Sequence, residues 1–551
     1  MTLPGVTIIR QEPGPAVQLG RADVAMFVGL VAREPAPLPV ALRAFLAEGG
    51  WVPMALPEAG DSAEACALLG LPVPVEGWDE FCALYRWDGR EVEADGPERI
   101  PSNLGLAVRS FFAEGGRKAY VVRTGEPEPL VDFRVEAGEF SAARRRLLDG
   151  LGKRRLGEKD AMRLPLLPGF ANPSNTPDPS ERATWTGAAA ILGVDDAAML
   201  LLPDLVELCA GRPERVSGEP QPPAPPEDFK PCAPALPAAL PADRPALPEW
   251  RASRLDRAGY ALWSGALGYV LELLGRPRGP VHRRDVMLVG ALPLPLASAG
   301  LDRGEEANPL RLLSEKGAVM SDQTLFAPDQ IGNARLQLAY PWIATADSRR
   351  CPEGVQSPEG AFAALVARQA LAKGAFHSAA GQAPATVLGT VPALALGDLR
   401  SATDRSSWLG ERLSLFGPRH GRLALLSDAT MADSRAWRAG GVSRLMGIIL
   451  RAARNLGQDQ MFEPSGPQLW SRLRGEMERF LEGLADRGAL TSVRGEPPYE
   501  VRCDRTTMTQ NDIDAGRAIM EIGFTAAYPL ERIRVSLNLI DPPPVRAREA
   551  A

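Results

Sequence analysis

The sequence predicts an α/β fold with more than one domain, and three observations lead to this prediction. The chain has 551 residues, which is enough for roughly two to four domains. Almost wholly apolar runs at residues 197–203, 286–291 and 422–426 are typical of strands buried in a parallel sheet. Helical patterns such as residues 257–274 alternate with these runs. We therefore expect a layered α/β region in the middle of the chain.

The amino-terminal part opens with an extended segment and continues into a strand pattern. Residues 3–8 precede Pro13-Gly14-Pro15, which interrupts any regular element. The apolar run 25–32 then predicts a strand, and residues 104–122 predict a helix, a Gly115-Gly116 turn and a second strand. Pro13-Gly14-Pro15 is either a hinge behind the extended segment or an ordinary turn, and Pro529 leaves the same two alternatives near the other end of the chain.

The last fifth of the chain predicts a compact unit of two helices followed by strands. Apolar residues recur at helical spacing over 441–455 and over 467–486, and strand patterns follow at 499–503 and 518–524. Residues 532–540 alternate with a period of two, with four apolar side chains on one face: Ile533, Val535, Leu537 and Leu539. Three prolines at 542–544 end this strand. The pattern leaves the terminal strand without a partner, so it needs a sheet edge.

Several motifs in this unit resemble one known family. Residues 458–470 resemble the "FEPN…LW" joint between two helices of contractile tail sheath proteins, which occur in phages and phage-derived injection systems. Residues 499–504 and 511–516 match the family's "V.CD…D…G" ending in order and spacing. Leu3-Pro4-Gly5-Val6 resembles the family's "PGVY" opening. Residues 357–385 resemble a further family helix, in which Ser357 is expected to be the N-cap.

The resemblance implies a mixed α/β, α+β sheath-protein fold with several domains. It divides the chain into five parts: an extended N-terminal arm (1–20), an N-terminal domain in the sheath core (21–130), a subtilisin-like but non-catalytic insertion domain (131–428), a C-terminal core domain (429–531) and a C-terminal β arm with a tail (532–551). Within the insertion, the proline-rich stretch 212–249 is a surface linker or wrapped loop, a disordered segment, or a ligand for a proline-binding partner.

The resemblance also implies a structural function. Such subunits polymerise as stacked hexameric rings around an inner tube and contract to drive the tube through an envelope. Their arms add strands to the C-terminal sheet of a neighbouring subunit. The corresponding arm residues here are Val6, Ile8, Ile533, Val535, Leu537 and Leu539, and those of the acceptor sheet are Val501, Met520 and Ile522. The implied partners are further copies, the inner tube protein, the baseplate and the tail terminator. The product is expected to be made in the host cytoplasm and to join a phage tail or an injection particle.

The alternative is a hydrolase-like α/β enzyme with an appended oligomerisation module. A serine hydrolase needs a serine, a histidine and a carboxylate brought together in space. The chain has three histidines, His282, His377 and His420, and no GxSxG motif surrounds a serine. His377 and Ser378 are adjacent in sequence, which does not by itself place one on the other. We expect no catalytic residues.

Bulk composition excludes other classes of function. A net charge of −6 argues against a nucleic-acid groove. No run reaches the about 18 to 20 apolar residues that a membrane span needs, and the N-terminus lacks a signal-peptide pattern. The six cysteines show no CxxC spacing, and phosphate-loop, dinucleotide and HExxH motifs are missing, so no metal or cofactor is expected. The acidic loop 504–514 lacks the calcium-loop register and is either a solvated turn or an ion-pair partner for another subunit.

Overall fold

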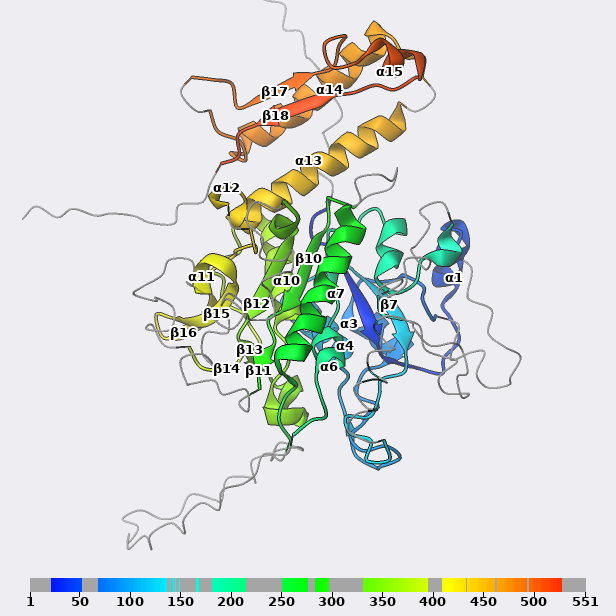
Figure 1. Cartoon of the computed structure of the whole chain (residues 1–551), viewed down its shortest axis with the longest axis vertical. Helices are drawn as coiled ribbons and strands as arrows, with labels where there is room; N and C mark the ends of the chain where they lie inside the picture. Colours follow the sequence, from blue (N-terminus) through cyan, green and yellow to red (C-terminus); the bar gives the residue numbers. More distant parts are fainter. Residues whose placement is uncertain are drawn as a thin grey trace, which may run out of the picture.

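The protein was analysed as a computed structural model of the whole chain (Figure 1). The structure describes residues 21–51, 68–135, 165–167, 181–214, 250–275, 283–296, 331–394, 409–432, 434–460, 463–492 and 495–527, together with Glu139, Ala142, Arg144 and Leu148. The arm residues Val6, Ile8, Ile533, Val535, Leu537 and Leu539 lie outside this part of the chain, as does His282.

An eight-stranded sheet forms the centre of the main body. Its six inner strands are parallel to one another, and β16 and β3 pair antiparallel with them at the two edges. The strands, in sheet order, are β16 (Arg422–Leu425), β15 (Ser414–Arg419), β12 (Leu336–Tyr340), β10 (Met287–Ala291), β8 (Met199–Leu201), β1 (Ala25–Leu30), β7 (Ala119–Gly125) and β3 (Val73–Val75).

Helices cover this sheet and bury its strands. All residues of β1, β7, β8 and β12 are buried, which is typical of a parallel sheet with both faces covered. Helix α4 (Asn103–Ala113) packs against α10 (Glu359–Lys373) and against β1, while α7 (Arg257–Gly275) lies in front of the sheet in Figure 1. Shorter helices complete the body: α1 (Val40–Glu48), α3 (Trp78–Leu84), α6 (Leu205–Cys209), α11 (Leu409–Arg412) and α12 (Arg435–Arg438).

Small strand pairs and 3-10 turns connect these elements. The pairs are β2 (Ala32–Arg33) with β4 (Tyr85–Arg86), β5 (Arg90–Glu91) with β6 (Arg99–Ile100), β9 (Arg254–Leu255) with β11 (Leu294–Pro295), and β13 (Trp342–Ala344) with β14 (Gly389–Val391). The 3-10 segments are η3 (Arg182–Thr184), η4 (Gly187–Gly193), η6 (Ile331–Arg335), η7 (Asp347–Arg350) and η8 (Pro352–Gly354).

The main sheet changes the predicted domain division. Strands β1, β3 and β7 come from the part expected to be an N-terminal domain, yet they belong to the same sheet as β8, β10 and β12 from the expected insertion. A boundary near residue 130 therefore does not separate two bodies. The run at 422–426 forms β16 but pairs antiparallel at the sheet edge, with Arg422 exposed, instead of lying in the parallel interior.

A second, smaller module follows the body. Helix α13 (Gly440–Asp459) leaves the top of the body, α14 (Pro467–Asp486) packs beside it, and strands β17 (Tyr499–Arg502) and β18 (Glu521–Phe524) lie on α14 (Figure 1). The short helix α15 (Gln510–Asp514) lies between the two strands in sequence. Both long helices were predicted from their apolar spacing. The second strand is shorter than the predicted 518–524.

Local capping also differs from expectation at two helices. Helix α10 starts at Glu359 with Pro358 as its N-cap, so Ser357 lies one residue before the cap, and its hydroxyl hydrogen-bonds the Glu359 carboxyl group instead. In the acidic loop, Thr509 and Asp512 form a capping box for α15, and Arg517 also donates to Asp512. Local hydrogen bonds thus involve both oxygens of the Asp512 carboxylate.

Candidate functional site

In the described part of the chain, the sheet of the C-terminal module consists of the two strands β17 and β18. Strands β17 and β18 pair antiparallel, with Tyr499 opposite Phe524 and Val501 opposite Ile522. Residues 489–491 extend this pairing beyond β18 through the bridge between Leu490 and Ala526. Within the described residues no further strand pairs with the outer edge of either strand. An isolated two-stranded sheet is only marginally stable, so this one depends on the helix beneath it.

The two strands alternate between a face on the helices and a face on solvent. Val501 is buried, Tyr499, Ile522 and Phe524 are half-buried, and Glu500 is exposed between them. The predicted acceptor residues Val501 and Ile522 are therefore paired neighbours on the inner face. Met520 precedes β18 and packs against the helices without belonging to the strand. Three of the four inward apolar side chains remain only half covered.

Helix α14 supplies the support under this sheet. Its buried residues Trp470 and Leu473 pack with Cys503 and Met508, while four further buried residues form a larger cluster with α13 and the strands: Met477, Phe480, Leu481 and Leu484. Pro467 occupies the first turn, where its missing N–H leaves no hydrogen bond unmade. From α13, Leu445, Ile448 and Ile449 complete the same cluster. The module thus has its own apolar core, separate from that of the body.

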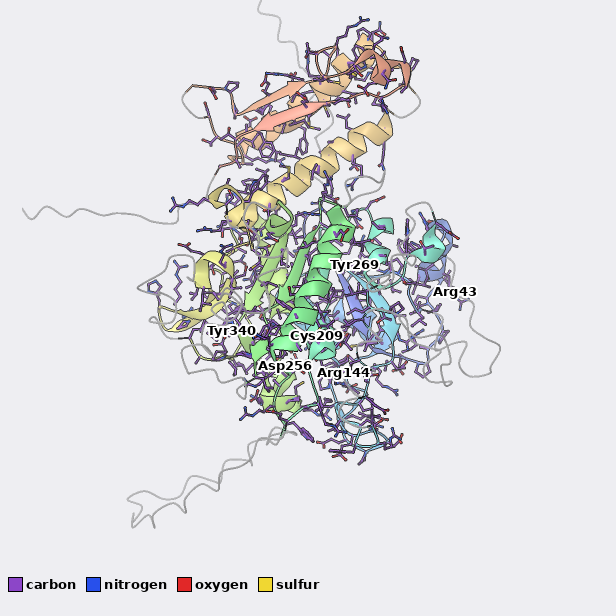
Figure 2. All side chains as sticks on the ribbon, in the orientation of Figure 1. Arg43, Arg144, Cys209, Asp256, Tyr269 and Tyr340 are labelled. Carbon is purple, nitrogen blue, oxygen red and sulfur yellow. The ribbon has the colours of Figure 1, made fainter. Side chains whose placement is uncertain are left out.

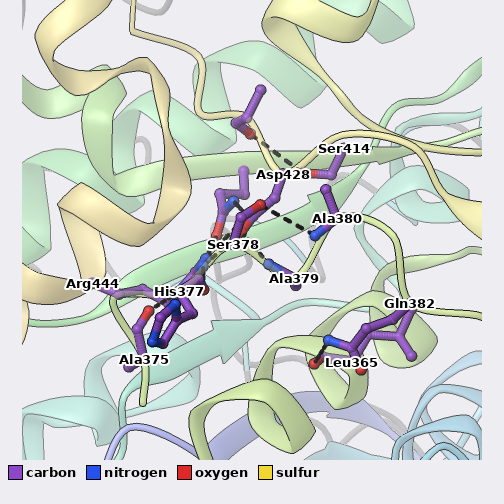
Figure 3. A network of polar contacts seen from close by, with 12 residues as sticks. Leu365, Ala375, His377, Ser378, Ala379, Ala380, Gln382, Ser414, Asp428 and Arg444 are labelled. Carbon is purple, nitrogen blue, oxygen red and sulfur yellow. Dashed lines mark hydrogen bonds and ion pairs between the residues drawn. The ribbon is translucent and has the colours of Figure 1, made fainter. Parts of the chain in front are cut away.

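A buried ion pair joins the start of α13 to the body. The Arg444 guanidinium donates to both carboxylate oxygens of Asp428, at 2.6 and 3.0 Å, and to the backbone carbonyls of Ala375 and His377 (Figure 3). Gln337 on β12 and the Ala379 N–H donate to the same carboxylate, at 2.7 and 2.8 Å. Burial alone would raise the pKa of Asp428, but these donors, Arg444 foremost, hold it below its usual range.

A second ion pair anchors the middle of the same helix. Arg454 of α13 donates to Asp285 at 2.8 Å, and Arg283 donates to the same carboxylate. The backbones also meet closely: a Cβ atom at Gly441 would lie 2.2 Å from the carbonyl oxygen of Phe376, and one at Gly447 would lie 2.7 Å from that of Asp285. Helix α13 is therefore fixed to the body at two points.

His377 and Ser378 are adjacent in sequence, but the structure does not arrange them as a general base and a nucleophile. The Ser378 hydroxyl accepts a hydrogen bond from the Ala380 N–H at 3.2 Å (Figure 3). The exposed His377 ring packs on Phe376. The neighbouring carboxylate, Asp428, is occupied by Arg444, Gln337 and Ala379. His420 lies in the exposed turn between β15 and β16 with a positive φ of 51°.

Charged side chains also meet at the carboxyl ends of β1 and β8, where open α/β sheets usually bind ligands. Glu207 on α6 pairs with Arg90 and Arg144, and Figure 2 shows Arg144 in the same lower part of the body as Cys209 of α6. Burial alone would raise the pKa of Glu207, but the two guanidinium groups lower it to about 2. Burial raises the pKa of nearby Asp204, which accepts from the Leu30 N–H, to about 7.

The space at this position is too small for a substrate. The cavity between Asp204, Glu207 and Asn103 measures about 10 Å³, and an adjoining one measures about 30 Å³. A single water molecule fills roughly that much space, whereas ligand pockets usually measure hundreds of Å³. Within the described residues no group of three or more His, Cys, Asp and Glu side chains could hold a metal ion, and no helix is long and apolar enough to cross a membrane.

The residues of the joint were not predicted from the sequence. Asp428 and Arg444 are separated by 16 positions, and neither belongs to a motif. A weak signal exists in Gly440-Gly441 at the helix start, since small residues often mark a close approach of two backbones.

Comparisons with known proteins place the fold. No protein-family model and no curated protein sequence matches the chain. Among solved structures, a chain of the contracted anti-feeding prophage baseplate is 17% identical, with a TM-score of 0.53 and all of both chains covered. A chain of the six-fold baseplate of the same system is 14% identical, with a TM-score of 0.50 over 98% of this chain and 99% of that one.

A chain of the contracted sheath complex of PVC, an extracellular contractile injection system, is 15% identical, with a TM-score of 0.50 and 98% of both chains covered. These likenesses run through the body and the C-terminal module alike. The protein therefore has the fold of contractile sheath proteins, as its motifs predicted.

Proposed function

We propose that this chain is a structural subunit of a contractile sheath, which polymerises as hexameric rings around an inner tube and contracts to drive that tube through a target envelope. The observation that supports this most is the combination of a full-length fold likeness with a two-stranded C-terminal sheet whose outer edges are open. No enzymatic step is part of the proposal, since the polar residues at the joint and at the sheet edge serve internal contacts.

Strand addition from neighbouring copies would complete the open sheet. An incoming strand gains backbone hydrogen bonds along the edge, while its alternate side chains cover the half-buried Ile522 and Phe524. The segment 532–540 has the required alternation, with Ile533, Val535, Leu537 and Leu539 on one face. The opening segment, with Val6 and Ile8, is the second candidate donor. The acceptor is the sheet that contains Val501 and Ile522.

Head-to-tail strand donation also favours rings and tubes over closed dimers, because the donor and acceptor surfaces are different. The six-fold symmetry of one compared baseplate supports rings of six. The partners in this proposal are further copies of the chain, the inner tube protein, the baseplate and the terminator of the sheath. The subunit would be made in the cytoplasm of the host and would act in a phage tail or an extracellular injection particle.

Electron microscopy of the purified protein and of two variants tests the proposal. Val535→Asp with Leu537→Asp places two carboxylates on the apolar face of the donor strand, which opposes its burial by several kcal/mol per copy. The matched control, Ser536→Asp with Asn538→Asp, adds the same charge to the polar face. We expect tubes or rings from the wild type and the control, and single subunits with native circular dichroism from the first variant.

Two results would contradict the proposal. Wild-type protein that remains as compact single particles at high concentration is not a sheath subunit of this kind. Normal tubes from Val535→Asp with Leu537→Asp would show that the carboxyl-terminal strand is not a lattice contact.

A further inference from the structure

A groove of about 440 Å³ lies where α12 and the start of α13 meet the carboxyl end of α7 and η6. Its walls are mostly apolar, with Trp437, Met446 and Leu450 among the lining residues. Arg284 and Arg335 line the same groove. The volume is sufficient for several side chains of another molecule, in contrast to the small cavities at the carboxyl ends of the strands.

Two side-chain polar atoms at the groove lack a hydrogen-bond partner, although Arg335 also donates to the Leu271 carbonyl and Arg284 to that of Gly275. The Nη1 atom of Arg335 and the Oγ atom of Ser443 are buried without a hydrogen-bond partner, and Ser443 is only 7% exposed. Burial, together with the charge of Arg284, lowers the pKa of Arg335 to about 10. A buried polar atom that is left without a hydrogen-bond partner destabilises the structure. An acceptor from outside the described residues would satisfy these two atoms.

The surroundings of the groove have a surplus of positive charge. Arg284 and Arg335 line the groove, and no carboxylate is found among its described lining residues. Asp285, whose charge reaches both Arg335 and Arg451, is already paired with Arg283 and Arg454. The group that fits here is therefore an anion on an apolar stem, which describes a glutamate side chain.

A row of carboxylates with the matching character lies on α14. Glu478, Glu482 and Asp486 are spaced by four residues and so share one side of the helix. Glu482 and Asp486 are exposed and form no ion pair among the described residues, and Glu478 has only a 3.7 Å contact with Arg474. Helix α14 belongs to the outer module (Figure 1), whereas the residues that line the groove come from the joint with the body. One copy could thus present both surfaces to different neighbours.

We propose that the groove at the joint receives the acidic row of α14 from a second copy of this chain, with Glu482 entering between Arg284 and Arg335. The inference rests on the proposed sheath function, because a repeating lattice brings copies of one chain into head-to-tail contact. Complementary charge of this kind fixes the register of a contact and excludes shifted ones. It would act together with strand addition, which by itself tolerates slippage along a strand.

A charge-swap cycle tests this contact. Arg335→Glu and Glu482→Arg each place like charges together, so each should raise the protein concentration needed for half-maximal assembly by about 10-fold or more. The double variant restores an opposite-charge pair and should return to within about threefold of the wild type. Arg349→Glu, at an exposed position on η7, is the control that should assemble normally. Circular dichroism and the Tm of each variant report on folding.

A zero-length cross-link identifies the occupant directly. Arg335→Lys introduces an amine into the groove, and a carbodiimide joins an amine to a carboxylate only when they touch. In particles assembled from isotope-labelled and unlabelled copies, we expect a cross-link between this amine and Glu482 of another copy. A cross-link formed within one copy, or to a different protein, contradicts the inference.

The assembly results distinguish a failure of this contact from a failure of the proposed sheath function. If wild-type tubes form and Arg335→Glu assembles normally, or if Glu482→Arg fails to rescue it, the groove contact is wrong and the sheath function stands. If the wild type does not assemble at all, the sheath function is wrong and this contact with it.

Discussion

The two sheets of the molecule differ in how complete they are. The body sheet has eight strands, and Val24 to Val28 and Val121 and Val122 in its centre are fully buried. The C-terminal sheet has two strands, and its inward residues Tyr499, Ile522 and Phe524 are half-buried. The body therefore contains the contacts that it needs for stability. The C-terminal sheet has a supporting helix, but within the described residues no strand pairs with its outer edges, which is the state expected of a sheet that is completed by assembly.

Helix α13 connects these two regions, and its fixed position matters for how they would move. Two buried carboxylates, Asp428 and Asp285, bind arginines of this helix from the body side. A force applied to the C-terminal sheet would be passed to the body through these contacts. The module and the body are thus expected to move together, while strands exchanged between copies keep neighbouring subunits linked.

The largest expected effect comes from breaking the joint. Asp428→Ala leaves the Arg444 guanidinium buried without its carboxylate, and loss of one partner of such a pair destabilises a protein by about 3–5 kcal/mol. Urea denaturation of unassembled protein measures this loss. Asp459→Ala, at the exposed end of α13, is the control and should change stability by less than about 0.5 kcal/mol. Equal stability of the two variants would show that the joint is not a stabilising contact.

A smaller effect is expected inside the body, where Glu359 is 2% exposed and its Oε2 atom has no partner. Burial raises its pKa from the ordinary value of 4.5 to about 8. The folded protein therefore holds a proton that the unfolded chain releases near pH 4.5. The stabilisation is complete below that pH and is lost as the pH rises through 8.

Glu359→Gln removes this dependence because glutamine does not titrate. We expect the Tm of the wild type to fall more between pH 5 and 8.5 than that of the variant, by roughly 2–5 °C. Glu98→Gln, at an exposed position, should behave as the wild type. Parallel Tm curves for the wild type and Glu359→Gln would show that Glu359 ionises normally. Since the C-terminal strands contain no buried carboxyl group, assembly should not follow this titration.

Local patterns in the sequence predicted the elements whose burial is periodic. The helices α13 and α14 follow from apolar residues at helical spacing, and β8 and β10 follow from uninterrupted apolar runs. Strand β12 was not predicted because Gln337 interrupts its apolar run. The Gln337 side chain donates a hydrogen bond to Asp428. A residue that makes a buried polar contact therefore prevented the prediction of this strand from hydrophobicity alone.

Long-range arrangement could not be predicted in the same way. The local pattern of residues 25–30 does not indicate which strands β1 pairs with. The structure pairs β1 with both β7 and β8, so the expected domain boundary lies inside one sheet. The two C-terminal strands were predicted from their strand pattern and family motifs, and the structure pairs Val501 with Ile522; their role as acceptors stays a prediction. The groove at the joint combines residues from α7, η6, α12 and α13, and no local motif indicates such a combination.

Hydrogen exchange tests most directly whether assembly completes the C-terminal sheet. Backbone amides of residues 499–502 and 521–524 should be compared between assembled particles and the unassembled variant Val535→Asp with Leu537→Asp. We predict that the outer-edge amides of these strands exchange quickly in single subunits and become protected in particles, while β1 is protected in both. If the amides of β17 and β18 exchange equally fast in both states, no strand is added at this sheet, and the central claim is contradicted.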